Sequence, residues 1–269
     1  MTLLTVSDLD DSMAAIYELE SRCLEMTDKT PYQIGCRAMN VQAVDRSQHY
    51  DTTVACVPVT AGIGVLGNFC HIVADIIRRF CGARAFVTTR MDVAGIQEAH
   101  RCGADIVFMA DDDVFFAYNV HTKVMSDNSD ATGRIFAALL ECASGGIDDE
   151  VLVLGAGGVG RGAYRYLQEQ GCDVRWFDVH PDVPKGMDPL RREPQWDRRS
   201  WNYIVEATTA YGLVDACNVT PRSVVSAPGV PFGLTPQAVD AARLVMHDNL
   251  ALGVVAMFCQ AACPPIGAE

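Results

Sequence analysis

The sequence predicts an α/β protein of two domains, the second built on a doubly wound parallel sheet. Three observations predict it. Strand-like and helix-like apolar patterns alternate along the 269 residues, which favours parallel pairing of the strands. A glycine turn follows the apolar run 151–154, and the next strand-like run ends on an acid, Asp178.

The first half of the chain predicts alternating strands and helices around a glycine-rich loop, residues 60–68. Polar, turn-prone residues at 125–132 indicate a change of domain near residue 131. The expected elements are a helix that starts near Ser7, strands over 53–59, 85–89 and 105–110, and helices over 69–80 and 93–101.

The second half repeats this alternation, with one irregular stretch over 180–199 that contains several prolines and arginines. That stretch predicts a surface loop with a short helix. The expected elements are helices over 133–142 and from Gly160 onward, strands over 151–154, 203–207, 223–227 and 244–247, a strand ending at Asp178, and a final apolar helix over 250–262.

The glycine turn has the spacing G-x-G-x-x-G that binds dinucleotides in Rossmann-type domains. Gly155 allows the tight turn, Gly157 lets backbone amides approach a pyrophosphate, and Gly160 lets the helix pack closely. Asp178 would accept both ribose hydroxyls and repel a 2′-phosphate, which predicts NAD; the alternative is a glycine-rich turn without a ligand. The expected coenzyme contacts here are Gly155, Gly157, Gly158, Val159, Gly160 and Asp178.

Composition excludes several classes of partner. A formal net charge of −13 argues against nucleic acid and anionic membranes. No apolar run is long enough to cross a bilayer, and acids at 8, 10 and 11 occupy the place of a basic signal-peptide segment. The eleven cysteines include no C-x-x-C pair, and the six histidines are scattered. We therefore expect reduced thiols, a cytoplasmic protein and no metal site.

A second glycine pattern, Gly62, Gly64 and Gly67, also lies between a strand and a helix. Three roles are open to it. The helix start could receive a substrate carboxylate, which we favour, or simply pack against its sheet. It could also bind a nucleotide, and residues 88–90 (Thr-Thr-Arg) would then meet a 2′-phosphate.

Acidic residues follow the predicted strand 105–110 directly, where ligands of open α/β sheets bind. Asp111 and Asp112 are therefore candidates for the site, against the alternative of a helix cap with solvated neighbours. Asn119, one or two helical turns further, and Thr208, at a strand end of the second domain, are further candidates. Many carboxylates and no nucleophile motif favour a cationic amine substrate, oxidised by hydride transfer to a nicotinamide.

These residues resemble a known family, the pyrrolysine-biosynthesis dehydrogenases, which oxidise 3-methylornithyl-N6-lysine. The similarity runs nearly the full length of the chain, and its most distinctive parts are TAG-x-G and MADD. The matching pieces are residues 3–5, 59–68, 104–119 and 132–133, the glycine turn with its acid, and residues 206–208, 227–230 and 253.

The resemblance implies a substrate domain over 1–131, an NAD domain over 132–248 and a final helix, 249–269, that returns to the first domain. It implies that the terminal amine of the substrate is oxidised, that the α-amine closes a five-membered ring, and that ammonia leaves. A small dipeptide-like amine is then the substrate, and we expect a homodimer. Two alternatives stay open: another amino-acid or shikimate-like dehydrogenase, and a nicotinamide-sensing module without catalysis.

The resemblance also assigns residues. Asp111 matches the acid at the substrate amine, and Leu4 matches a residue that closes over the substrate. Ala61 stands where the family is expected to have a serine, which puts one substrate contact in doubt. The full expected set is Asp111 for catalysis, Leu4, Ala61, Gly62, Ile63, Asp112 and Asn119 for substrate, and Thr208 and Pro228 beside the glycine turn for coenzyme.

Overall fold

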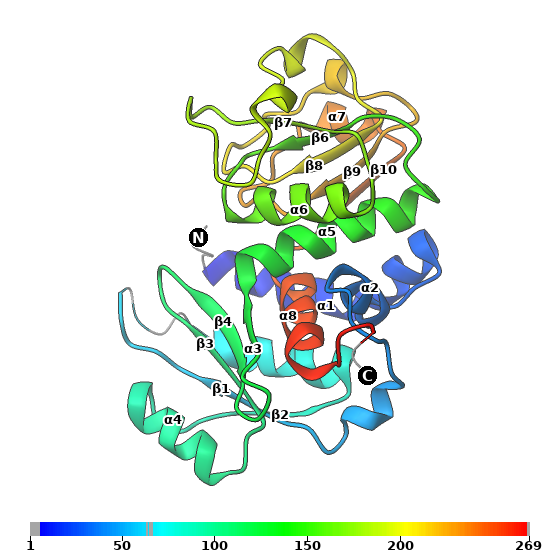
Figure 1. Cartoon of the computed structure of the whole chain (residues 1–269). Helices are drawn as coiled ribbons and strands as arrows, with labels where there is room; N and C mark the ends of the chain where they lie inside the picture. Colours follow the sequence, from blue (N-terminus) through cyan, green and yellow to red (C-terminus); the bar gives the residue numbers. More distant parts are fainter. Residues whose placement is uncertain (1–5, 63, 65–66, 268–269) are drawn as a thin grey trace. The chain divides into compact units, whose positions relative to one another are not determined.

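The computed structural model describes residues 6–62, 64 and 67–267, and they divide into two compact units. One unit contains the described residues up to Ala131 and from Leu250 onward, and the other contains Thr132–Asn249. Each unit has one five-stranded sheet (Figure 1). The predicted α/β class with two sheets is confirmed.

The sheet of the second unit is entirely parallel, in the order β10-β9-β8-β6-β7. The strands next to β6 are β7, which follows it in the chain, and β8, which lies on its other side. The strand order therefore reverses between β6 and β8, and ligands of such sheets bind at this switch point. The strands are β6 (Val151–Leu154), β7 (Val174–Phe177), β8 (Tyr203–Glu206), β9 (Val224–Ala227) and β10 (Leu244–His247).

The helix that follows the glycine turn packs on β6 and on its two neighbours, β7 and β8. Its Tyr166 hydroxyl donates to Glu141 of the preceding helix at 2.7 Å, and the two helices lie side by side (Figure 1). The helices are α5 (Asn128–Ser144), α6 (Gly158–Glu169) and α7 (Pro236–Ala241), with short 3-10 turns at Pro189–Arg191, Trp196–Arg198 and Ala216–Asn218.

The sheet of the first unit is mixed, in the order β2-β1-β3-β4-β5. Only β1, β2 and β3 are parallel; β4 and β5 are antiparallel to their neighbours. The expectation of purely parallel pairing was therefore wrong for this unit. The strands are β1 (Thr53–Val57), β2 (Arg84–Val87), β3 (Ile106–Ala110), β4 (Phe115–Asn119) and β5 (Met125–Asp127).

A tight turn after β3 explains the difference. Asp111 Oδ1 accepts hydrogen bonds from the Asp113 and Val114 amides at 2.9 and 2.7 Å, which reverses the chain. Burial then alternates along β4, as on a strand with one covered face. Asn119 is thus the last residue of a strand and does not lie on a helix.

The stretch over 125–132 is also more regular than its polar composition predicts. It forms β5 and the first turn of α5, which begins at Asn128. Asp127 Oδ1 accepts a hydrogen bond from the Asp130 amide at 3.1 Å, so a side chain just before the helix satisfies one of its free donors.

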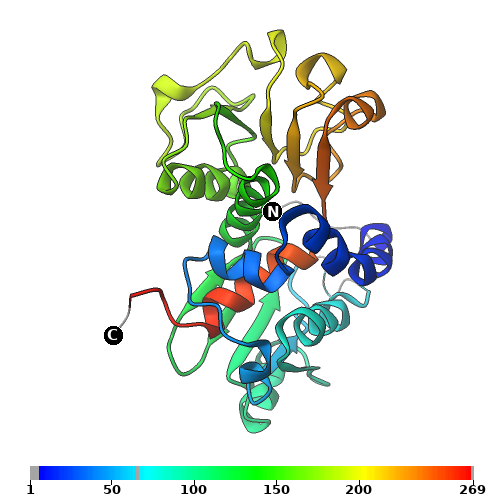
Figure 2. The ribbon, with the colours of Figure 1, turned by 90° about the vertical axis from the view of Figure 1, so that its right-hand side faces the viewer.

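The final helix belongs to the first unit and packs against α2 (Figure 2). Gly35 makes this close contact possible, because a Cβ there would lie 3.0 Å from the Cys259 sulfur. The helices of this unit are α1 (Val6–Thr27), α2 (Pro31–Ala38), α3 (Phe69–Ile76) with a π turn at Ile77–Cys81, α4 (Asp92–Arg101) and α8 (Ala251–Ala262).

The eleven cysteines all lie among the described residues, and none of them forms a disulfide bond. Among the described residues we find no His, Cys, Asp or Glu cluster suited to a metal ion. The helices in the described part of the chain are also too short or too polar to span a membrane.

Candidate functional site

The glycine turn between β6 and α6 needs its glycines for different physical reasons. Gly155 has φ +86°, and a Cβ there would lie 2.6 Å from the carbonyl oxygen of Ala207. A Cβ on Gly160 would overlap the carbonyl of Gly155, so α6 lies against the turn. A Cβ on Gly157 would meet no atom within 4 Å. Gly155 and Gly160 therefore serve packing, whereas Gly157 borders open space.

The first backbone amides of α6 have no side-chain cap, which is what a phosphate site requires. Gly157 is the residue before the helix, and no side chain caps its free amides. These amides and the positive end of the helix dipole favour an anion. Gly158 and Val159, in the first turn, are partly exposed.

Asp178 follows β7 immediately and reaches the glycine turn. Its Oδ2 accepts a hydrogen bond from the Ala156 amide at 2.6 Å, and its Oδ1 accepts one from the His180 amide at 2.8 Å. The carboxylate is thus held at the edge of the turn, where an adenine ribose would lie in a dinucleotide site. These residues fit a dinucleotide coenzyme.

On the other side of the switch point, Thr208 lies just after the end of β8 and Pro228 just after the end of β9. The Thr208 hydroxyl donates to Glu206 and accepts from the Ala210 amide at 3.2 Å. Pro228 is buried, and the next residue, Gly229, donates its amide to the Glu206 carbonyl at 3.0 Å. The two strand ends are therefore tied to each other.

Glu206 is the residue in this region that sequence reasoning did not select. Its side chain is fully buried, and burial raises the pKa of its carboxyl to about 7, although hydrogen bonds from Thr208 and from the Gly233 backbone favour the charged form. A glutamate that ends a strand is usually exposed. The sequence signal for the burial of Glu206 is a pair of distant glycines, Gly229 and Gly233, whose lack of a side chain leaves space for its carboxyl group.

In the first unit, the glycine loop after β1 meets the acidic turn after β3. Gly62 has φ +69°, and a Cβ there would overlap the carboxylate of Asp112. The structure thus brings together two residues that we expected to bind the substrate. Ala61 is exposed, whereas Leu4 and Ile63 lie outside the described residues.

Asp111 is exposed and lies in the same turn as Asp112. Backbone hydrogen bonds from Val114 and Asp113 hold the pKa of its carboxyl below the usual value. Both bonds go to Oδ1, and neither of them uses Oδ2. Asp111 is therefore a stable anion with one oxygen available to a cation, and a poor proton acceptor at neutral pH.

Asn119 is buried and serves the fold. Its amide nitrogen donates to the Ala261 carbonyl at 2.9 Å, and its oxygen accepts from the amides of His121 and Thr122 at 2.9 and 3.0 Å. These bonds connect β4 with the end of α8. A role in substrate binding stays a prediction.

In the first unit, the backbone and hydroxyl donors that a 2′-phosphate would need at residues 88–90 are already engaged. Glu98 accepts hydrogen bonds from the Thr89 and Arg90 amides, both at 2.9 Å, and from the Thr89 hydroxyl. These backbone bonds lower the pKa of Glu98, so a negative charge persists where a 2′-phosphate would lie. This disfavours the nucleotide alternative for the second glycine pattern.

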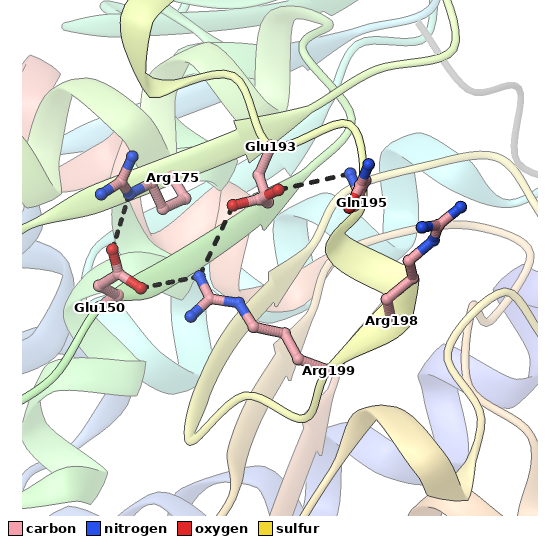
Figure 3. Close-up of a pocket in the computed structure, with 6 residues that line it drawn as sticks. All are labelled: Glu150, Arg175, Glu193, Gln195, Arg198 and Arg199. Carbon is pink, nitrogen blue, oxygen red and sulfur yellow. Dashed lines mark hydrogen bonds and ion pairs between the residues drawn. The ribbon is translucent and has the colours of Figure 1, made fainter.

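A separate open hollow of about 470 Å³ lies in the second unit, near the start of β6 (Figure 3). Glu150 pairs there with Arg175 and Arg199, both at 2.7 Å. Arg199 also lies 3.8 Å from Glu193. The carboxylates already have cationic partners, and the hollow lies at the strand end opposite to the glycine turn.

Comparison with known proteins places the chain among enzymes of pyrrolysine biosynthesis. Residues 9–126 match the family model of the pyrrolysine biosynthesis protein PylD, N-terminal domain. The pyrrolysine synthase of Methanosarcina acetivorans is 30% identical over 270 residues, covering 96% of this chain and 98% of that protein. The pyrrolysine synthase of Methanosarcina barkeri is 28% identical over 264 residues, covering 96% and 97%.

Solved structures share the fold at low sequence identity. The bifunctional 5,10-methylenetetrahydrofolate dehydrogenase/cyclohydrolase of Thermoplasma acidophilum has a TM-score of 0.53 at 13% identity, covering 88% of this chain and 96% of its own. Shikimate 5-dehydrogenase of Thermus thermophilus, in complex with NADP(H) and shikimate, has a TM-score of 0.50 at 19% identity, covering 80% and 95%. These likenesses extend to the fold alone.

Proposed function

This chain belongs to the pyrrolysine synthase family, and we propose that it oxidises the terminal amine of 3-methylornithyl-N6-lysine with NAD⁺ to form pyrrolysine. The oxidised carbon is then attacked by the α-amine of the same molecule, which closes a five-membered ring and releases ammonia. One NAD⁺ is reduced for each ammonium released. Ring closure needs little help because both reacting groups belong to one molecule.

The position of Asp178 carries the choice of coenzyme. Bound NAD⁺ would accept the hydride that leaves the amine-bearing carbon. The protein would hold its pyrophosphate at the bare start of α6 and its adenine ribose at Asp178, next to the Ala156 amide. A 2′-phosphate would meet the same carboxylate and be repelled, so NAD is favoured over NADP.

The substrate amine is assigned to the acidic turn of the first unit. An aliphatic ammonium carries a positive charge at neutral pH, and Asp111 presents a persistent negative one. Asp111 would therefore bind and orient the ammonium, and the proton released before oxidation would go to water or another group. Asp112, which lies against Gly62, would contribute the neighbouring wall of this site.

The experiment is a coupled measurement of NADH and free ammonia with the purified chain. NAD⁺ and 3-methylornithyl-N6-lysine should give both products in equal amounts. NADH formed from shikimate or plain ornithine instead would favour a shikimate-like dehydrogenase. Tight NAD⁺ binding without turnover of any amine would favour a sensing module.

We also propose a cytoplasmic homodimer as the working form. Eleven cysteines without a disulfide bond fit a reducing compartment. Sedimentation at several protein concentrations measures the oligomeric state, and a single monomeric species at all of them would contradict the dimer.

A further inference from the structure

A carboxyl group that the proposed reaction does not use lies at the switch point of the second sheet. Glu206 ends β8 and is fully buried. Its Oε1 accepts hydrogen bonds from the Thr208 hydroxyl and from the Thr208 amide, the latter at 2.9 Å. Its Oε2 makes no hydrogen bond of normal geometry to a described residue, although the backbone amide of Gly233 faces the carboxyl and favours its charged form. An unpartnered buried oxygen costs free energy, so its retention calls for an explanation in function.

The surroundings are shaped around this side chain. A Cβ on Gly229 would lie 2.5 Å from Oε2, and a Cβ on Gly233 would overlap the carboxyl carbon. The backbone of Glu206 is also bonded to Gly229, through its carbonyl oxygen. Glu206 therefore contacts both the loop after β8 and residues 228–233.

The strand order of the sheet indicates which end of the coenzyme would contact the loops after β8 and β9. The adenine ribose is assigned to Asp178 on the β7 side, and the pyrophosphate to the turn after β6. The rest of a bound dinucleotide would then extend to the opposite side of β6, over the ends of β8 and β9. A Cβ on Gly155 would touch the carbonyl of Ala207, so the two strand ends adjoin. The nicotinamide end of a bound dinucleotide would therefore lie toward Thr208 and Pro228.

We propose that Glu206 is a positioning residue for the nicotinamide end of the coenzyme and that its charge state selects between oxidised and reduced coenzyme. This rests on the proposed function. The oxidised ring carries a positive charge that the reduced ring lacks. A carboxylate at Glu206 therefore favours NAD⁺, and the neutral acid removes that preference.

The charge of Glu206 changes within the physiological range, since burial raises its pKa to about 7. The residues packed against it, Thr208, Gly229 and Gly233, have no side chain that titrates in this range. At the neighbouring strand ends, β7 is followed by Asp178, and β10 ends in His247 with Asp248 after it. His247 Nδ1 lies 2.6 Å from the Ala227 carbonyl oxygen and donates a hydrogen bond to it.

The test is the affinity of the full chain for NAD⁺ and for NADH, by calorimetry at about pH 6 and about pH 8. For the unaltered protein, the ratio of the NADH to the NAD⁺ dissociation constant should rise about three- to tenfold over this range. Glu206→Gln keeps the shape and cannot ionise, so its ratio should stay constant. Glu150→Gln, the same change at the opposite sheet edge, should behave like the unaltered protein.

A ratio that rises equally in Glu206→Gln, or that does not rise in the unaltered protein, would overturn the inference while leaving coenzyme binding intact. Failure of the unaltered protein to bind either coenzyme would instead overturn the proposed function and this inference with it. Thr208→Val provides a second variant should Glu206→Gln not fold. It removes a hydrogen bond that favours the charged form, so the rise should move to higher pH; an unmoved midpoint counts against the role of Glu206.

Discussion

The chain contains two glycine turns of the same spacing, one in each unit, and their surroundings differ. At the turn over 155–160, the space beside Gly157 is empty and the acid of the next strand, Asp178, bonds to the turn itself. At the turn over 62–67, the carboxylate of Asp112 fills the space beside Gly62. Spacing alone therefore does not specify a nucleotide site; the occupied or empty space around each glycine does.

The strongest test of this comparison contrasts two glycines of one turn. Gly160→Ala should lower the free energy of unfolding by about 3 kcal/mol, because its Cβ would overlap the Gly155 carbonyl. Gly157→Ala should leave the fold nearly unchanged and weaken NAD⁺ binding at least about tenfold, because the methyl group enters the open space. Denaturant unfolding and calorimetry measure the two effects. Equal stability losses in both variants would contradict the distinction.

Removing the acid beside the coenzyme turn should have the next largest effect. Asp178→Ala should weaken NAD⁺ binding about 10- to 100-fold, since charged hydrogen bonds to two ribose hydroxyls are lost. Asp112→Asn, in the other turn, is the control and should bind NAD⁺ normally. If the two variants bound NAD⁺ equally well, the coenzyme site would have to be assigned to the first unit instead.

Asp111→Asn tests whether the acidic turn of the first unit binds the substrate amine. It should lower kcat/KM for the amine about 10- to 30-fold through loss of one ion pair, with NAD⁺ affinity retained. The lowered pKa of Asp111 means that its charge is present above the ordinary aspartate range and is lost only as pH falls through the lower folded value. The KM of the unaltered enzyme should thus show no titration of this group near neutral pH. Full activity of the variant would remove Asp111 from the site.

The smallest expected effect concerns Ala61, which is exposed in the glycine loop of the first unit. Ala61→Ser adds a hydroxyl without disturbing packing, and we expect a decrease in KM of about threefold or less, with kcat and thermal stability unchanged. Steady-state kinetics and a melting curve measure this. A large loss of stability would show that the loop is packed more tightly than its exposure indicates.

The second unit could be predicted well because its signals are local. An apolar run, three glycines and an acid lie within 30 residues of one another, and each has a defined mechanical or chemical reason. In the first unit, α2 also begins with a local signal, the capping box of Thr30 and Gln33 with Pro31 at the first helical position. Local signals of this kind can be recognised without knowledge of the tertiary structure.

The hairpin after β3 and the burial of Glu206 could not be predicted in the same way. The hairpin depends on one carboxylate, Asp111, that accepts two backbone amides, and the acidic sequence equally fits a helix start. The burial of Glu206 depends on Gly229 and Gly233, which lie more than twenty residues away in the chain. Such contacts arise only when distant strands pair.

The central claim is that the second unit binds NAD with its adenine ribose at Asp178. A crystal structure of the chain with bound NAD⁺ tests it most directly. We predict both ribose hydroxyls within hydrogen-bond distance of the Asp178 carboxylate and the pyrophosphate at the start of α6. Coenzyme bound instead at residues 62–67, or an empty glycine turn at saturating NAD⁺, would contradict the account.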